Sequence, residues 1–111
     1  MDYEYRDERT RKLFEDDREF GKRYGERGLK NRDRRLNEIA NSTDAAELLR
    51  LGKRGPGNWH VLDNRHGGSD EGKISGDLTG NLRLLLEPPT TPLGQTTKVV
   101  IIEVKDTHKK K

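Results

Sequence analysis

The apolar residues of this chain are concentrated in its last third, and this distribution constrains the fold more than any other feature. Residues 98–104 read Lys-Val-Val-Ile-Ile-Glu-Val, a run rich in β-branched residues. Such a run predicts a strand buried on both faces, because a strand with one solvated face would alternate apolar and polar residues. We therefore expect residues 98–104 to form the most buried strand of a small sheet, beside a strand over residues 82–87.

Shorter segments supply the remaining strands. Four of them have strand character, at residues 3–5, 59–62, 73–78 and 82–87. The pair Gly80-Asn81 predicts a hairpin turn between the last two. A glycine inside a strand favours a bulge, which we expect at Gly76. Residues 88–97, with three prolines, predict a loop.

The first half of the chain predicts helices. Residues 7–24 carry a narrow apolar stripe on an otherwise charged surface, formed by Leu13, Phe14, Phe20 and Tyr24. Glycines at positions 25 and 28 interrupt this pattern, and a second helix is expected over residues 29–40. Two charged helices joined by a glycine turn indicate an antiparallel hairpin laid on a sheet. A short third helix is expected over residues 45–51.

The order of elements defines an α+β fold, in which an N-terminal helical hairpin packs on one face of a small, mainly antiparallel sheet. The chain has 111 residues, of which 28% are hydrophobic and 39% charged. One domain over residues 1–108 with a modest core is expected from this composition. The lysines at 109–111 predict a disordered basic tail.

Composition also limits the possible functions. The chain has no cysteine, which excludes disulfides, thiol catalysis and cysteine-ligated zinc. It shows neither a secretory leader nor an apolar run of membrane length, so a soluble, cytosolic protein without membrane contact is expected. The net charge is +3, and residues 53–111 hold all of it, with 10 Lys and Arg against 7 Asp and Glu. This charge allows nucleic-acid binding, and equally it could only solubilise a thin core.

Five motifs from Leu48 onward occur in a recognisable order. They are Leu48-Leu49-Arg50-Leu51, Trp59-His60-Val61-Leu62, Gly72-Lys73-Ile74-Ser75-Gly76-Asp77-Leu78, Gly80-Asn81-Leu82-Arg83-Leu84-Leu85-Leu86-Glu87-Pro88 and Ile102-Glu103-Val104-Lys105-Asp106-Thr107-His108. Together they resemble the RelE/ParE toxin superfamily, and specifically its HigB-like killer-protein branch. Thr107 stands where that family has a tyrosine, and Ile74 where it commonly has an aromatic residue.

The resemblance implies a function. Members of that branch are toxins of type II toxin-antitoxin systems, which cleave mRNA on the ribosome and are neutralised by a HigA-like helix-turn-helix antitoxin. RNA cleavage of this kind needs no metal and no cofactor: a base activates the 2′-OH, a cation stabilises the phosphorane, and an acid protonates the leaving 5′-oxygen. The resemblance therefore predicts a metal-independent endoribonuclease that stops translation and growth.

The candidate catalytic residues are His60, Arg83, Asp106 and His108. Arg83 lies within an apolar strand, where a guanidinium needs a partner. That partner would be a substrate phosphate or, with a purely structural role, Asp77, Glu87 or Glu103. Asp106 and His108 are two residues apart and would share one face of an extended strand, which we expect to include Arg83.

His60 is expected to face away from the core because its neighbour Trp59 is the better core residue. It would then serve as a second acid or base, or simply be a surface histidine. Candidate RNA-binding residues are Lys53, Arg54, Arg65, Lys73 and Thr107, which could instead form a solvated face. The group His60, Asp63, His66 and Asp70 matches no common zinc spacing, so no metal site is expected.

Two other functions remain open at this stage. The first is a non-catalytic superfamily member that acts by binding a protein, as gyrase-poisoning toxins do. Asp106 and His108 argue against this reading, and Thr107 argues for it. The second is an RNA- or ribosome-binding module that uses the same basic residues without cleaving.

Overall fold

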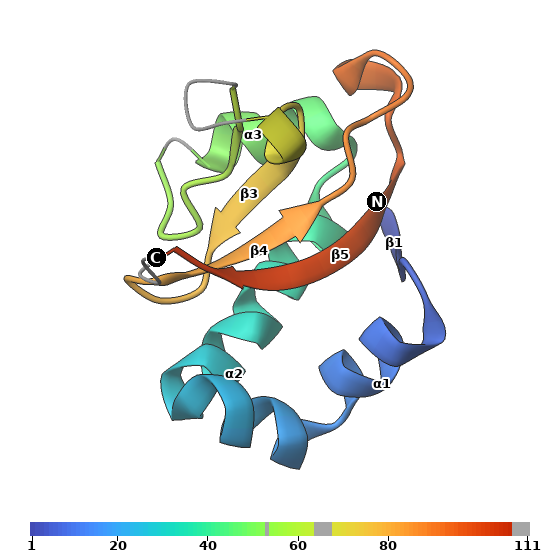
Figure 1. Ribbon diagram of the computed structural model, residues 1–111. Coiled ribbons are helices and arrows are strands. Elements are labelled where there is room, and N and C mark those ends of the chain that lie inside the picture. The colour runs from blue at the N-terminus through green and yellow to red at the C-terminus, as the bar shows by residue number, and fades with distance from the viewer. Residues whose placement is uncertain (53, 64–67, 108–111) are drawn as a thin grey trace.

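The computed structural model describes residues 1–52, 54–63 and 68–107 and confirms the α+β fold (Figure 1). The helices are α1 (Glu8–Glu15), α2 (Asp17–Asn41) and α3 (Ala45–Gly52), with short 3₁₀ turns η2 (Gly68–Asp70) and η3 (Leu93–Gln95). The strands are β1 (Asp2–Tyr5), β2 (His60–Val61), β3 (Ile74–Asp77), β4 (Leu82–Leu86) and β5 (Lys98–Asp106). Within the described ranges, no helix is long and apolar enough to cross a membrane.

The five strands form one sheet in the order β1-β5-β4-β3-β2. β1 runs parallel to β5, and every other neighbouring pair is antiparallel. The predicted hairpin between β3 and β4 is present, with Leu78 N–H donating to the carbonyl oxygen of Leu82 at 2.9 Å. The predicted neighbourhood of β4 and β5 is also confirmed.

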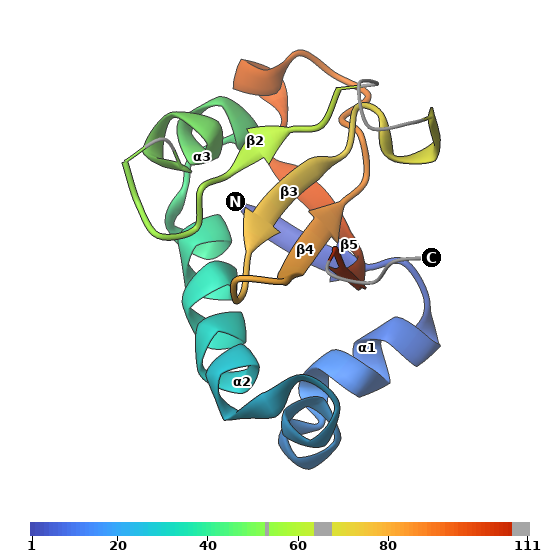
Figure 2. The ribbon, with the colours of Figure 1, turned by 60° about the vertical axis from the view of Figure 1, so that its left-hand side comes forward.

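The core lies between one face of this sheet and the helices. Alternate residues of β4 and β5, such as Leu84, Leu86 and Ile101, are fully buried there against Phe20 and Ile39. Figures 1 and 2 show α1 and α2 together on one side of the sheet. The other face of β4 is also covered in part, since Leu85, between Leu84 and Leu86, is buried too.

β5 differs from the prediction of a strand buried on both faces. Val99, Ile101 and Ile102 are buried, but Glu103 and Lys105 are exposed. The middle position of the sheet belongs to β4, whose Leu84–Leu86 segment is wholly buried. Ile101 and Ile102 are consecutive, yet both are buried. The pairing of β5 with β4 shifts register between Leu85 and Leu86, and such an irregularity lets two successive side chains occupy buried positions.

Gly76 does not form the expected bulge. The pairing of β3 with β4 is regular through it, with Gly76 opposite Leu84. Instead, a Cβ at position 76 would lie 2.5 Å from the indole ring of Trp59. The glycine is therefore required for the close approach of the Trp59 ring to the strand.

The helical hairpin is present with different boundaries. The segment predicted as one helix over residues 7–24 is divided at Asp16, whose carboxylate accepts the Glu19 N–H at 3.0 Å and caps α2. The expected turn at the glycines is a kink inside α2, where Gly25 adopts a φ of 84°. Only glycine adopts this backbone conformation readily, so α2 bends there without a loop.

Arg32 fixes α1 and α2 to each other. Its buried guanidinium donates from Nη1 to the Phe14 carbonyl and from Nη2 to Asp17, both at 2.8 Å. The same group lies 5.2 Å from the centroid of the Phe20 ring. A buried arginine with this many partners is well compensated for its loss of hydration.

Candidate functional site

The sheet face opposite α1 and α2 carries a row of charged residues. Asp77, Arg83 and Lys105 are register neighbours on β3, β4 and β5. Because side chains alternate along a strand, residues aligned in this way share one face. Their sequence neighbours Leu84 and Val104 pack against the core on the other face. The row therefore lies on the face opposite α1 and α2.

Arg83 is the most constrained member of the row. Its Nε lies 3.2 Å from Asp77 Oδ1, and Nη1 donates to the carbonyl oxygens of Thr79 at 3.0 Å and of Gly80 and Leu82, each at 3.2 Å. Of the three acids that could have paired with it, the structure selects Asp77. The contact is an ion pair without hydrogen-bond geometry, since Asp77 Oδ1 is buried and has no hydrogen-bond partner among the described residues. The guanidinium is thus held at the β3–β4 turn.

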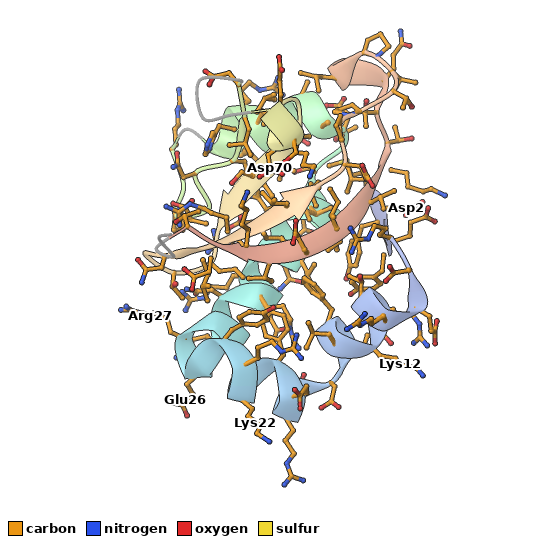
Figure 3. All side chains as sticks on the ribbon, viewed as in Figure 1. Asp2, Lys12, Lys22, Glu26, Arg27 and Asp70 are labelled. Atoms are coloured by element: carbon orange, nitrogen blue, oxygen red, sulfur yellow. The ribbon has the colours of Figure 1, made fainter. Side chains whose placement is uncertain are left out.

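Lys105 and Lys73 share one carboxylate. Asp70 Oδ1 accepts from Lys73 Nζ at 2.8 Å, and Asp70 Oδ2 accepts from Lys105 Nζ. Hydrogen bonds from Lys105 and then Lys73 hold the pKa of Asp70 below its usual range. Figure 3 shows Asp70 on one side of the β4 and β5 ribbons and the helix residues Lys12, Lys22 and Arg27 on the other. Asp70 therefore ties the η2 segment to the charged face.

His60 is exposed on β2, as predicted, and Trp59 beside it is buried. Its Nδ1 lies 2.8 Å from the carbonyl oxygen of Asn58. Because a carbonyl oxygen only accepts, Nδ1 is the donor of this hydrogen bond. His60 pairs with Ser75 and so shares the face of Arg83. Strand spacing and rise place the two backbone positions roughly 12 Å apart.

Asp106 does not share the face of Arg83, and the expected convergence is wrong. It is opposite Leu82 in the register, whereas Arg83 is opposite Lys105. Residues one position apart on a strand point to opposite faces, so Asp106 belongs to the side of Leu82. Thr107 follows, and both its N–H and its hydroxyl donate to the Asn81 carbonyl oxygen, at 2.8 and 3.0 Å. His108 lies outside the described residues.

The predicted RNA-binding residues that the structure describes lie on different segments. Arg54 is exposed in the turn after α3, and Lys73 is partly buried in its pair with Asp70. Lys53, Arg65 and His66 lie outside the described residues. Over the described ranges, no three His, Asp or Glu side chains are placed to hold a metal ion.

Two members of the charged face were not anticipated from the sequence. Lys105 alternates with Val104 in β5, and this alternation was the available signal for its exposure. Asp70 was considered only as a metal ligand; its contact with Lys105 spans 35 residues of sequence. No local pattern indicates a contact over that separation.

Comparison with known proteins adds no relative. No protein-family model matches the chain, and no curated protein matches it significantly. The resemblance to the HigB-like toxins therefore rests on the five ordered motifs.

Proposed function

We propose that this protein is a HigB-like toxin of the RelE/ParE superfamily that cleaves ribosome-bound mRNA and is neutralised by a helix-turn-helix antitoxin. Three features support the proposal: the ordered motifs, the α+β fold with helices on one sheet face, and the charged row on the other face. The observation that carries it is the Arg83 guanidinium, held at the β3–β4 turn with the ammonium of Lys105 on the neighbouring strand. Both cations are partly exposed and already paired, Arg83 with Asp77 and Lys105 with Asp70. A phosphodiester would bind them by replacing one of these partners.

The chemistry follows from the placement of these groups. Arg83 would stabilise the charge that develops on the phosphorane, and Lys105 would hold the adjacent phosphate. His60 would take the 2′-OH proton on its Nε2 atom, because Nδ1 is engaged with Asn58. Both side chains must reach the same nucleotide, because the 2′-OH attacks the phosphate next to it. His60 and Arg83 would therefore extend toward each other across the roughly 12 Å between their backbone positions. The acid that protonates the 5′-oxygen would be His108, a role that rests on the resemblance to the HigB-like toxins and not on the described geometry.

The test is cleavage of a ribosome-programmed message with mapping of the 5′ ends. Arg83→Ala should abolish cleavage and growth arrest, whereas Arg18→Ala, an exposed arginine at the start of α2, should retain both. The reaction itself should need no metal at the protein, because a base, a cation and an acid suffice for 2′-OH attack. Full activity of a folded Arg83→Ala protein would contradict the proposed role of this residue.

One observation favours a second function, an RNA- or ribosome-binding module without cleavage. Arg83 already contacts Asp77 and three carbonyl oxygens, so binding a phosphate requires it to exchange some of these partners. A module of this kind would arrest translation without producing new 5′ ends. The same end-mapping experiment separates the two functions.

A further inference from the structure

An open groove of about 1020 Å³ lies between the second half of α2 and the β3–β4 turn. Three exposed cations line it, namely Arg27, Lys30 and Arg34. Their spacing of three and four residues places them on one face of the helix, within about 10 Å along its axis. Figure 3 labels Arg27 on this part of α2.

These cations are not neutralised by the acids around them. Of the acidic residues that line the groove, Asp17 and Asp33 pair with Arg32, and Asp77 pairs with Arg83. The fourth is Glu26, which points away from the sheet in Figure 3. In the described part of the chain, Arg27, Lys30 and Arg34 form no ion pair. The groove therefore has a net attraction for anions.

The wall of the groove contains a further, buried arginine. Arg35 lines the groove with its side chain 2% exposed, and its Nε–H has no acceptor within the described residues. Asp77 also lines the groove, and its Oδ1 lies 3.2 Å from Arg83 Nε. A buried N–H without an acceptor is costly, so a shift of the Arg35 side chain toward an anion in the groove would be favourable.

The groove is continuous with the charged face. Thr79 and Gly80 form its edge, and their carbonyl oxygens accept from Arg83 Nη1 at 3.0 and 3.2 Å. Asn31 joins the helix to this turn by donating to the Leu78 carbonyl at 2.6 Å. An RNA strand that runs from Arg83 around the β3–β4 turn would thus enter the groove, which has cations along one wall.

We propose that this groove binds the phosphate backbone of the RNA strand beyond the segment held at Arg83, with Arg27, Lys30 and Arg34 contacting successive phosphates. The choice of RNA rests on the proposed function, because the groove begins at the turn that holds Arg83. An acidic protein segment is the competing occupant, and the experiment below distinguishes it.

The experiment measures binding separately from cleavage. The probe is a labelled single-stranded RNA of about 12 nucleotides with 2′-O-methyl groups, which cannot be cleaved by 2′-OH attack. The triple variant R27Q/K30Q/R34Q is compared with R9Q/K12Q/R18Q, which removes the same charges from exposed positions of α1 and the start of α2. Circular dichroism and thermal melting verify that both variants are folded.

The groove variant should bind the probe at least about tenfold more weakly at 0.1 M salt, and its slope of log K against log salt should be shallower by about 2. The control variant should stay within about threefold of wild type. Equal losses in both variants, no loss in the groove variant, or equal competition by a poly-glutamate peptide of matched charge would overturn the inference.

The two proposals fail in different ways. If the wild type cleaves message but the groove variant binds RNA normally, the groove inference is wrong and the proposed ribonuclease stands. If the wild type does not cleave message, and only the groove variant binds the RNA probe more weakly, the proposed ribonuclease activity is wrong and the proposed RNA-binding groove is supported.

Discussion

Arg83 and Asp77 lie directly opposite each other on the β3–β4 hairpin, with Arg83 Nε 3.2 Å from Asp77 Oδ1. Their side chains are 26% and 28% exposed, so both charges are partly removed from water. An ion pair in this position is screened less than one on an open surface. The pair holds the guanidinium that the proposed chemistry requires.

A double-mutant cycle with Asp77→Asn and Arg83→Gln should reveal this coupling. We expect an interaction energy of about 1 kcal/mol from urea denaturation of the two single variants and the double variant. The matched control is the Glu4–Lys98 pair at 3.3 Å, whose side chains are 54% and 58% exposed. Its coupling should be close to zero. Equal coupling in both cycles would show that burial does not strengthen the Arg83 pair.

Gly76→Ala should lower the melting temperature markedly. The added Cβ would meet the Trp59 ring at 2.5 Å, so the indole or the strand must move. Overpacking of this kind costs about 1–3 kcal/mol, which corresponds to a fall of roughly 5–15 °C in a domain of this size. Gly94→Ala is the control, since nothing lies within 4 Å of a Cβ at that position. Calorimetry measures the melting temperature of both variants. A comparable fall in both would contradict the packing explanation.

The fold class was predictable from the sequence because each element has a local signal. A continuous apolar run marked β5, and Gly80-Asn81 marked the hairpin between β3 and β4. The stripe that includes Phe14 and Phe20 marked the helices. Boundaries were harder to predict. Asp16 begins a new helix through its capping hydrogen bond, and Gly25 bends α2 through its φ of 84°. The cap at Asp16 and the bend at Gly25 both depend on local backbone conformation. Residue patterns of this kind also occur inside continuous helices and in loops, so neither boundary followed from the sequence alone.

The candidate site was only partly predictable, because a site on a sheet depends on register. The alternation of Trp59 and His60 indicated correctly which residue faces outward. Asp106 and Arg83 were expected on one face, and the register places them on opposite faces. A shift of one residue reverses the face of every side chain, and the sequence of β5 does not fix its pairing with β4.

Asp70→Asn should destabilise the protein at neutral pH and have much less effect in acid. The pKa of Asp70 is lowered in the folded state, first by Lys105 and then by Lys73. Its stabilising effect is therefore complete above about pH 4, the usual range of an unfolded aspartate, and is lost as the pH falls through the lower folded value.

The measurement is the free energy of unfolding of wild type and Asp70→Asn between about pH 3 and pH 7. The difference between the two proteins should narrow at the acidic end. Lys105→Gln should reduce the same pH dependence, because Lys105 contributes most to the shift. A difference that stays constant over the whole range would show that the Asp70 carboxylate is not stabilised by its lysines.

Lys105 and Asp106 provide the sharpest test of which sheet face carries the chemistry. They are adjacent in β5, yet Lys105 is opposite Arg83 and Asp106 is opposite Leu82. If RNA is cleaved on the Arg83 face, Lys105→Gln should lower kcat/KM for a ribosome-programmed message about tenfold or more, because a cation beside the phosphate is lost. Asp106→Asn should leave kcat/KM within about threefold. Lys105→Gln also breaks the contact with Asp70, so Asp70→Asn is assayed in parallel to separate loss of stability from loss of the cation. The reverse result, with Asp106→Asn inactive and Lys105→Gln active, would place the reaction at the end of β5 on the other face and remove Arg83 from it.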